Sequence, residues 1–290
     1  MRLLSYRGDG GTDRLAVAIT DDTVVDVTDL MRDGPWTMTR LLDDVAPNLA
    51  HLRAALGAGA EGGARPIATL RLLPPVIRPG KIVAVGRNYR EHAAEEAAVL
   101  PGAPLVFAKF PSSLIGDGGI VSWSAALATQ VDHEAELAVV IGRTARNVSV
   151  DHALDHVLGY SCLNDVSARD LQVLDGQWIR AKSLDTFCPM GPWVVTADDI
   201  PDPGALRVRC RVNGEVRQDA STAELVHGIA ELISYCSRSF TLEPGDVIAT
   251  GTPGGVGAFR VPPVFLGDGD LVEVEIERIG TLRNRCRVVA

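Results

Sequence analysis

The chain has little of what marks several common classes of protein. Its five cysteines are odd in number and scattered, and no two form a CxxC pair. This spacing argues against a disulfide framework and against a cysteine zinc site. Basic residues are also in the minority, with 28 lysines and arginines against 37 aspartates and glutamates, for a net charge of −9. The acidic balance argues against nucleic acid or an anionic membrane as a partner.

Long apolar runs are missing as well. No segment approaches the length of a transmembrane span, and the first residues, MRLLSYRGDGGTDR, lack the apolar core of a signal peptide. We therefore expect a cytoplasmic protein with reduced thiols that acts on a small molecule. A small acidic substrate is compatible with the net charge, because the local charge of a site can oppose it.

The chain does contain patterns for a small first unit and a larger second one. Short strand patterns interrupted by turn residues fill residues 3–30, and a helical pattern follows over residues 37–56. The proline-rich stretch RLLPPVIRPG then predicts a boundary near residue 73. The remainder is rich in strand patterns, with a hairpin predicted at Asn213-Gly214 and one amphipathic helix over residues 221–240.

Two glutamates, Glu134 and Glu136, precede an apolar strand in VDHEAELAVVIG, and Asp165 follows in GYSCLNDVSARDLQ. Residues two apart on a strand point to the same face, ~7 Å apart. The strand is apolar on both faces and is therefore expected to be buried. Buried like charges are costly unless a cation shares them, so the pattern favours a divalent metal. A solvated strand end with two surface glutamates, and a loop or capping role for Asp165, remain alternatives.

A second constellation is GRNYREHAAEE, directly after a predicted strand. His92 and Glu95 lie three residues apart on a predicted helix, so the pair can act as an oriented general base. A surface helix with ordinary charges is the alternative. Arg87 lies in the preceding turn, where residues are often functional.

Four further residues are candidates for contacts with a ligand. Lys182, among aromatic residues in QWIRAKSLDTFCPMGPW, either snorkels or faces a pocket. On a helix, Arg169 and Gln172 would share a face with Asp165, and Ser167-Ala-Arg-Asp170 is predicted to form a capping box. The segment ATGTPGGVGAF lacks the ending of a phosphate loop, so Thr252 lies either beside a ligand or in a plain glycine turn.

Taken together and in order, these segments resemble the fumarylacetoacetate hydrolase family. The matching stretches cover about residues 74–290 and are KIVAVGRNYREHAAE, FAKFPSSLIG, VDHEAELAVVIG, GYSCLNDVSARDLQ, AKSLDTFCPMGPWVVT and GDVIATGTPGGVG. The resemblance implies a mostly β, α+β fold: a mixed β-sandwich roll over residues 74–290 as catalytic domain. Residues 1–73 look like a small accessory α+β domain.

The resemblance also implies the chemistry. It assigns Glu134, Glu136 and Asp165 as ligands of Mg²⁺, or of Mn²⁺ or Ca²⁺, in a homodimer. It assigns the catalytic residues as His92, Glu95 and Lys182, and the substrate-binding residues as Arg87, Arg169, Gln172 and Thr252. The expected activity is hydrolysis of a C–C bond in an acylpyruvate or related 2-keto acid or 1,3-diketone, through a metal-stabilised enolate. Oxaloacetate-like decarboxylation or tautomerisation, dienoate isomerisation, and a catalytically silent metal-binding paralogue are the alternatives.

Overall fold

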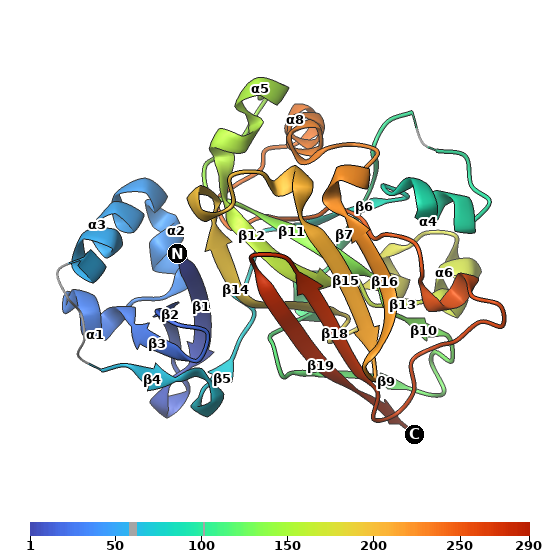
Figure 1. The fold of residues 1–290 in the computed structure, drawn as a ribbon, viewed down its shortest axis with the longest axis horizontal. Coiled ribbons are helices and arrows are strands. Elements are labelled where there is room, and N and C mark those ends of the chain that lie inside the picture. The colour runs from blue at the N-terminus through green and yellow to red at the C-terminus, as the bar shows by residue number, and fades with distance from the viewer. Residues whose placement is uncertain (58–62, 101) are drawn as a thin grey trace.

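Most of the protein is built on one large sheet, which the computed structural model describes together with the rest of residues 1–57, 63–100 and 102–290 (Figure 1). Its strands are β1 (Arg2–Arg7), β2 (Asp13–Ala18), β3 (Thr23–Asp26), β4 (Arg65–Pro66), β5 (Arg71–Leu72), β6 (Ile82–Gly86), β7 (Leu105–Lys109), β8 (Leu114–Ile115), β11 (Ala135–Ile141), β12 (Val157–Asn164), β14 (Cys188–Thr196) and β17 (Val247–Ala249). They follow the order β4-β3-β2-β1-β14-β12-β11-β17-β6-β7, with β5 beside β1 and β8 beside β14.

A second sheet packs against the first. It has the order β16-β15-β18-β19-β9, and β10 and β13 form a separate pair. The bounds are β9 (Ile120–Ser124), β10 (Val131–Asp132), β13 (Ser167–Ala168), β15 (Arg207–Val212), β16 (Glu215–Ser221), β18 (Leu271–Ile276) and β19 (Gly280–Val289). Leu137 and Val139 of β11 lie in one core cluster with Val208 and Val274 of the second sheet. The two faces therefore share a core, as in a sandwich.

The helices contribute to both core clusters: Leu41 and Leu52 belong to one, and Leu232 and Ile233 belong to the cluster shared with the second sheet. The helices are α1 (Val27–Met31), α2 (Met38–Asp43), α3 (Val45–Gly57), α4 (Arg90–Glu95), α5 (Val150–Ala153), α6 (Arg169–Asp175), α7 (Ile179–Lys182) and α8 (Ile229–Ser239). Short 3₁₀ segments are η1 (Asp9–Gly11), η2 (Ile67–Thr69), η3 (Pro111–Ser113), η4 (Leu154–His156), η5 (Ala197–Asp199), η6 (Pro203–Ala205), η7 (Thr222–Glu224) and η8 (Gly257–Phe259). Within the described ranges, no helix combines the length and hydropathy that crossing a membrane requires.

The predicted α+β class with many strands is confirmed, and β11 is buried on both faces as expected. Its residues alternate between two core clusters: Leu137 and Val139 belong to the cluster shared with the second sheet, while Ala138 and Val140 belong to the cluster that includes residues of the first unit. This double burial means that any polar group at the start of β11 lies close to the interior.

The first unit is continuous with the large sheet, as Figure 1 shows at the left. Strand β1 is antiparallel to β14, with Arg2 opposite Val195 and Leu3 opposite Val194. The functional division between residues 1–73 and 74–290 stays a prediction, and part of the glycine-rich connection, 58–62, lies outside the described residues.

One predicted hairpin is present and one predicted helix is shorter than expected. Asn213 and Gly214 join β15 to β16 and both have positive φ, 52° and 81°, as a two-residue hairpin turn requires. The helix predicted over 221–240 begins only at Ile229. Ser221 and Glu224 instead form a capping box at the start of the short 3₁₀ segment η7, which is separate from α8.

Candidate active site

The three predicted metal ligands lie together at one end of the paired strands β11 and β12. Glu136 is opposite Leu163 in the ladder, and the Asp165 N–H donates to the Glu134 carbonyl at 2.8 Å. One carboxylate oxygen from each of Glu134, Glu136 and Asp165 lies within 4.8 Å of the others, and all three residues are buried. The strand pairing thus brings Asp165 beside the two glutamates although it is 29 residues from Glu136.

Two of the carboxylates are held by cationic side chains. Lys182 Nζ lies 2.6 Å from Glu134 Oε2 and 2.8 Å from Asp165 Oδ2, and Arg169 Nη2 lies 2.7 Å from Glu134 Oε1. Burial alone would raise the pKa of Glu134, but the charges of Lys182 and Arg169 lower this pKa to about 2. Glu134 is therefore ionised at any physiological pH.

A second buried lysine, Lys109, was not identified from the sequence. It ends β7 and is buried, and its Nζ donates to Asp165 Oδ1 at 2.6 Å. Its Nζ also donates to the Lys182 carbonyl, which ties β7 to α7. The available signal was a lone lysine ending the apolar run PLVFAK, a position where a charged residue is buried only when it has a partner.

Glu136 differs from the other two carboxylates. Its Oε2 accepts a hydrogen bond from the Gly251 N–H at 2.8 Å, and no ion pair of Glu136 occurs among the described residues. Burial, together with the negative charges of Asp165 and Glu134, raises the pKa of Glu136 well above its ordinary value. Three buried oxygen donors with one lacking a cationic partner fit a hard divalent cation, which Glu134, Glu136 and Asp165 would hold.

His92 faces the same cavity from α4 and lies between two glutamates. Its Nδ1 is 3.6 Å from Glu95 Oε2, and its Nε2 is 3.2 Å from Glu96 Oε1. Burial would lower the pKa of His92, but Glu95 and Glu96 raise this pKa to about 9. Glu96 was missed in the sequence, although a residue four positions after His92 lies on the same helix face.

Glu95 also fixes the position of a neighbouring loop. Its Oε1 accepts a hydrogen bond from the Gly255 N–H at 2.6 Å, so one carboxylate contacts both His92 and the glycine-rich segment. The Nε of Arg87 donates to Glu96 Oε2 at 2.6 Å. The His92 environment is thus a network of two carboxylates, one guanidinium and one backbone amide.

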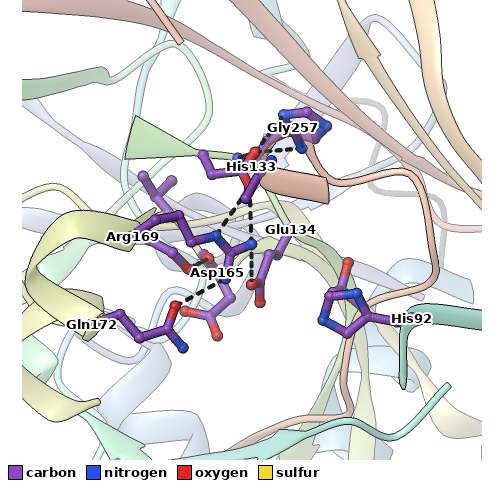
Figure 2. A network of polar contacts seen from close by, with 12 residues as sticks. His92, His133, Glu134, Asp165, Arg169, Gln172 and Gly257 are labelled. Carbon is purple, nitrogen blue, oxygen red and sulfur yellow. Dashed lines mark hydrogen bonds and ion pairs between the residues drawn. The ribbon is translucent and has the colours of Figure 1, made fainter. Parts of the chain in front are cut away.

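The structure brings most of the predicted residues to one narrow cavity, and Figure 2 shows several of them. It is lined by Val85, Gly86, Arg87, His92, Glu96, Phe107, Glu134, Glu136, Arg169, Gln172, Trp178, Lys182 and Thr252. Gln172 accepts from Arg169 Nη1 at 3.1 Å. The hydroxyl of Thr252 is engaged within the protein, since it donates to the Ala135 carbonyl at 3.0 Å and accepts from Gln218 Nε2 at 2.7 Å.

Asp132 is another residue that sequence reasoning missed. It is fully buried, and its Oδ2 accepts from Arg169 Nε at 3.0 Å while its Oδ1 accepts from the Gly257 N–H at 2.8 Å. Figure 2 shows Arg169 and Gly257 in this network beside Glu134. The only sequence signal was its place two residues before Glu134, on the same face of an extended chain.

The capping box predicted from Ser167 to Asp170 is wrong. Helix α6 begins after Ala168, which makes no side-chain cap, and the Ser167 hydroxyl donates to the Asp165 carbonyl at 2.9 Å instead. Ser167 is held in the short strand β13, so its backbone pairs with β10 and its side chain turns toward the site. Asp165 consequently lies before the helix and not on the helix face of Arg169.

In this two-sheet fold, three buried carboxylates, two buried lysines and a paired histidine form a site whose oxygen donors suit a divalent cation. The chain belongs to the fumarylacetoacetate hydrolase family, since the family model described as fumarylacetoacetate (FAA) hydrolase C-terminal matches residues 81–287.

Individual relatives cover nearly the whole chain. It is 39% identical to "Oxaloacetate tautomerase fahd2, mitochondrial" of Xenopus laevis over 98% of this chain and 89% of the relative. It is similar to the solved fumarylacetoacetate hydrolase of Exiguobacterium antarcticum, with 38% identity, full coverage of both chains and a TM-score of 0.84. A maleylpyruvate hydrolase from Sphingobium sp. SYK-6, solved in complex with manganese(II) and pyruvate, is 36% identical over both full chains with a TM-score of 0.82.

Proposed function

We propose that this protein is a divalent-metal-dependent enzyme that interconverts the keto and enol forms of a 2-oxo acid of the oxaloacetate type. The observation that carries the proposal is His92, buried between Glu95 and Glu96 and lining the same cavity as Glu134 and Glu136. Tautomerisation moves one proton between carbon and oxygen, so it needs a proton carrier at a cation site. The likeness to an oxaloacetate tautomerase supports this choice.

The chain's own residues would divide the work as follows. Because its pKa is raised to about 9, His92 holds a proton at neutral pH and can deliver it to the enol carbon. The enol hydroxyl loses its proton as the keto form appears, and this proton returns to the imidazole through solvent. Both transfers are reversed in the keto-to-enol direction. Glu95 and Glu96 fix the ring and stabilise its charged form. Lys182 and Arg169 place two positive charges beside the carboxylate cluster, where an anionic substrate requires them. A divalent cation bound by Glu134, Glu136 and Asp165 would polarise the 2-oxo group as a Lewis acid.

Hydrolysis of an acylpyruvate-type C–C bond is the second candidate. The same His92–Glu95 pair can orient a water, and the likeness to a maleylpyruvate hydrolase favours it. That reaction needs His92 to accept a proton from water, so the ring must first lose its own. We rank tautomerisation first because of the likeness to an oxaloacetate tautomerase over nearly the whole chain and the position of His92 between Glu95 and Glu96. Mg²⁺ as the physiological metal, a homodimer and a cytoplasmic location stay predictions.

The test measures both reactions on one preparation. Enol-oxaloacetate decay and acetylpyruvate cleavage are followed with Mg²⁺, with Mn²⁺ and with EDTA. We expect metal-dependent acceleration of the first, and a loss of roughly 10²–10⁴-fold in kcat in His92→Gln. His152→Gln is the matched control, because His152 is an exposed histidine that also pairs with an acidic residue three positions later, Asp155. Cleavage of acetylpyruvate without any effect on oxaloacetate would select the second candidate instead.

A further inference from the structure

A second pocket lies directly outside the carboxylate cavity. Its volume is about 420 Å³, within the ~300–1,000 Å³ that small-molecule sites occupy. The two spaces share five lining residues, which are Arg87, Glu96, Arg169, Gln172 and Trp178. They are therefore adjoining spaces separated by these side chains: the inner cavity contains the buried charges, and the second space is here called the outer pocket.

The outer pocket has a different chemical character from the inner cavity. Beyond the shared residues and Gln130, its walls are Val173, Ala258, Phe259, Pro263 and Phe265. Val173 is 84% exposed and Phe259 is 38% exposed, so apolar side chains meet water at the entrance. Exposed apolar groups gathered around a cavity mark a binding surface more often than a plain protein surface.

The wall formed by residues 257–259 is fixed relative to the inner site. Asp132 accepts hydrogen bonds from the Gly257 N–H at 2.8 Å and the Ala258 N–H at 3.0 Å, and the same carboxylate holds Arg169. The ring of Phe259 lies 6.0 Å from that of His92 and 6.0 Å from Arg169 Cζ. A wall held in place before binding loses little conformational entropy when a ligand arrives.

We propose that the outer pocket binds an apolar, aromatic substituent of a 2-oxo acid whose acid end occupies the inner cavity. The aromatic walls contributed by Trp178, Phe259 and Phe265 suit a planar ring, which packs favourably against aromatic faces and edges. The proposal rests on the proposed function for the acid end of the substrate. It adds that the preferred substrate is larger and more apolar than a four-carbon dicarboxylate, which would leave these walls uncovered.

The test compares oxamate with N-phenyloxamate by calorimetry in the presence of Mn²⁺. Both probes present the same 2-oxo acid group, and only the second carries a ring. We expect N-phenyloxamate to bind about tenfold more tightly or better, since a half-enclosed ring loses much of its contact with water. Val173→Asp should remove most of this difference and leave oxamate binding unchanged.

The neighbouring residue supplies a matched control. Leu174 lies on the same helix and is 76% exposed, but it does not line the outer pocket, so Leu174→Asp should preserve the preference for N-phenyloxamate. Phe265 does line the outer pocket, so Phe265→Ala should reduce the preference as Val173→Asp does. In the wild type, phenylpyruvate should be tautomerised with a lower KM than oxaloacetate. Val173→Asp and Phe265→Ala should remove this difference.

The outcomes separate this proposal from the proposed function. Equal affinity for the two probes overturns the outer pocket, whatever the protein does to oxaloacetate. A preference for N-phenyloxamate without any tautomerase activity keeps the pocket and overturns the proposed function. Absence of binding by either probe at millimolar concentration overturns both. If Val173→Asp changes the elution volume of the protein and not the ratio of affinities, the face is a contact between copies and the proposal is wrong.

Discussion

Replacing His92 with glutamine should change how the stability of the metal-free protein depends on pH. In the folded protein Glu95 and Glu96 raise the pKa of His92 from 6.5 to about 9. A raised pKa means that the folded state binds the proton more tightly than the unfolded chain does. The resulting stabilisation is fully present below pH 6.5 and is lost as the pH rises through 9.

The magnitude follows from the same two values. Each pKa unit corresponds to ~1.4 kcal/mol. A rise of the His92 pKa from 6.5 to about 9 therefore adds ~3 kcal/mol to the free energy of unfolding below pH 6.5, relative to its value above pH 9. The side chain of His92 is only 4% exposed, so screening by solvent removes little of this. Glu96, whose pKa His92 and Arg87 lower to about 2 against the effect of burial, stays ionised throughout and adds no slope of its own.

Urea unfolding in EDTA, at half-unit steps from about pH 5.5 to pH 10, measures the effect. The difference in unfolding free energy between wild type and His92→Gln should shrink by ~3 kcal/mol across this range. His152→Gln, which removes an exposed imidazole beside Asp155, controls for the general effect of losing a histidine. A difference between wild type and His92→Gln that stays flat with pH would refute the assignment of a protonated His92 between two carboxylates.

Three other outcomes test the site and the fold. Glu136→Gln should abolish Mn²⁺ binding in calorimetry while the circular dichroism spectrum stays native. We expect EDTA to lower the Tm of the wild type and to leave that of Glu136→Gln unchanged. An unchanged affinity for Mn²⁺ would contradict the metal site. Lys109→Met should destabilise the protein by ~1.5–3 kcal/mol in urea, because Asp165 loses one of its two buried partners and keeps Lys182; a change below ~0.5 kcal/mol would show that the pair is not structural. A fragment of residues 74–290 should keep its Mn²⁺ site but aggregate, because β14 loses its partner strand β1 and exposes an unpaired edge. Light scattering measures the aggregation, and a monodisperse fragment would argue against the shared sheet.

Much of the inner site could be predicted because its residues stand in short segments with strong local patterns. Glu134 and Glu136 are two apart beside an apolar strand, and His92 and Glu95 are three apart on a helix, so local geometry alone brings each pair together. Lys109 could not be assigned in this way. Its partner Asp165 follows β12 and is 56 residues away, and only tertiary packing brings Lys109 Nζ within 2.6 Å of Asp165 Oδ1.

The sequence by itself determined the alternation of the strands, the hairpin at Asn213-Gly214 and the order of motifs that identifies the family. These depend on side-chain periodicity and turn chemistry, which neighbouring residues decide. The tertiary structure alone decided that Asp132 holds both Arg169 and the 257–259 wall, and that an apolar outer pocket adjoins the charged cavity. Asp132 and Arg169 are 37 positions apart, and a contact over that separation leaves no periodic pattern in the sequence. Such contacts depend on how whole strands and loops pack in the assembled core.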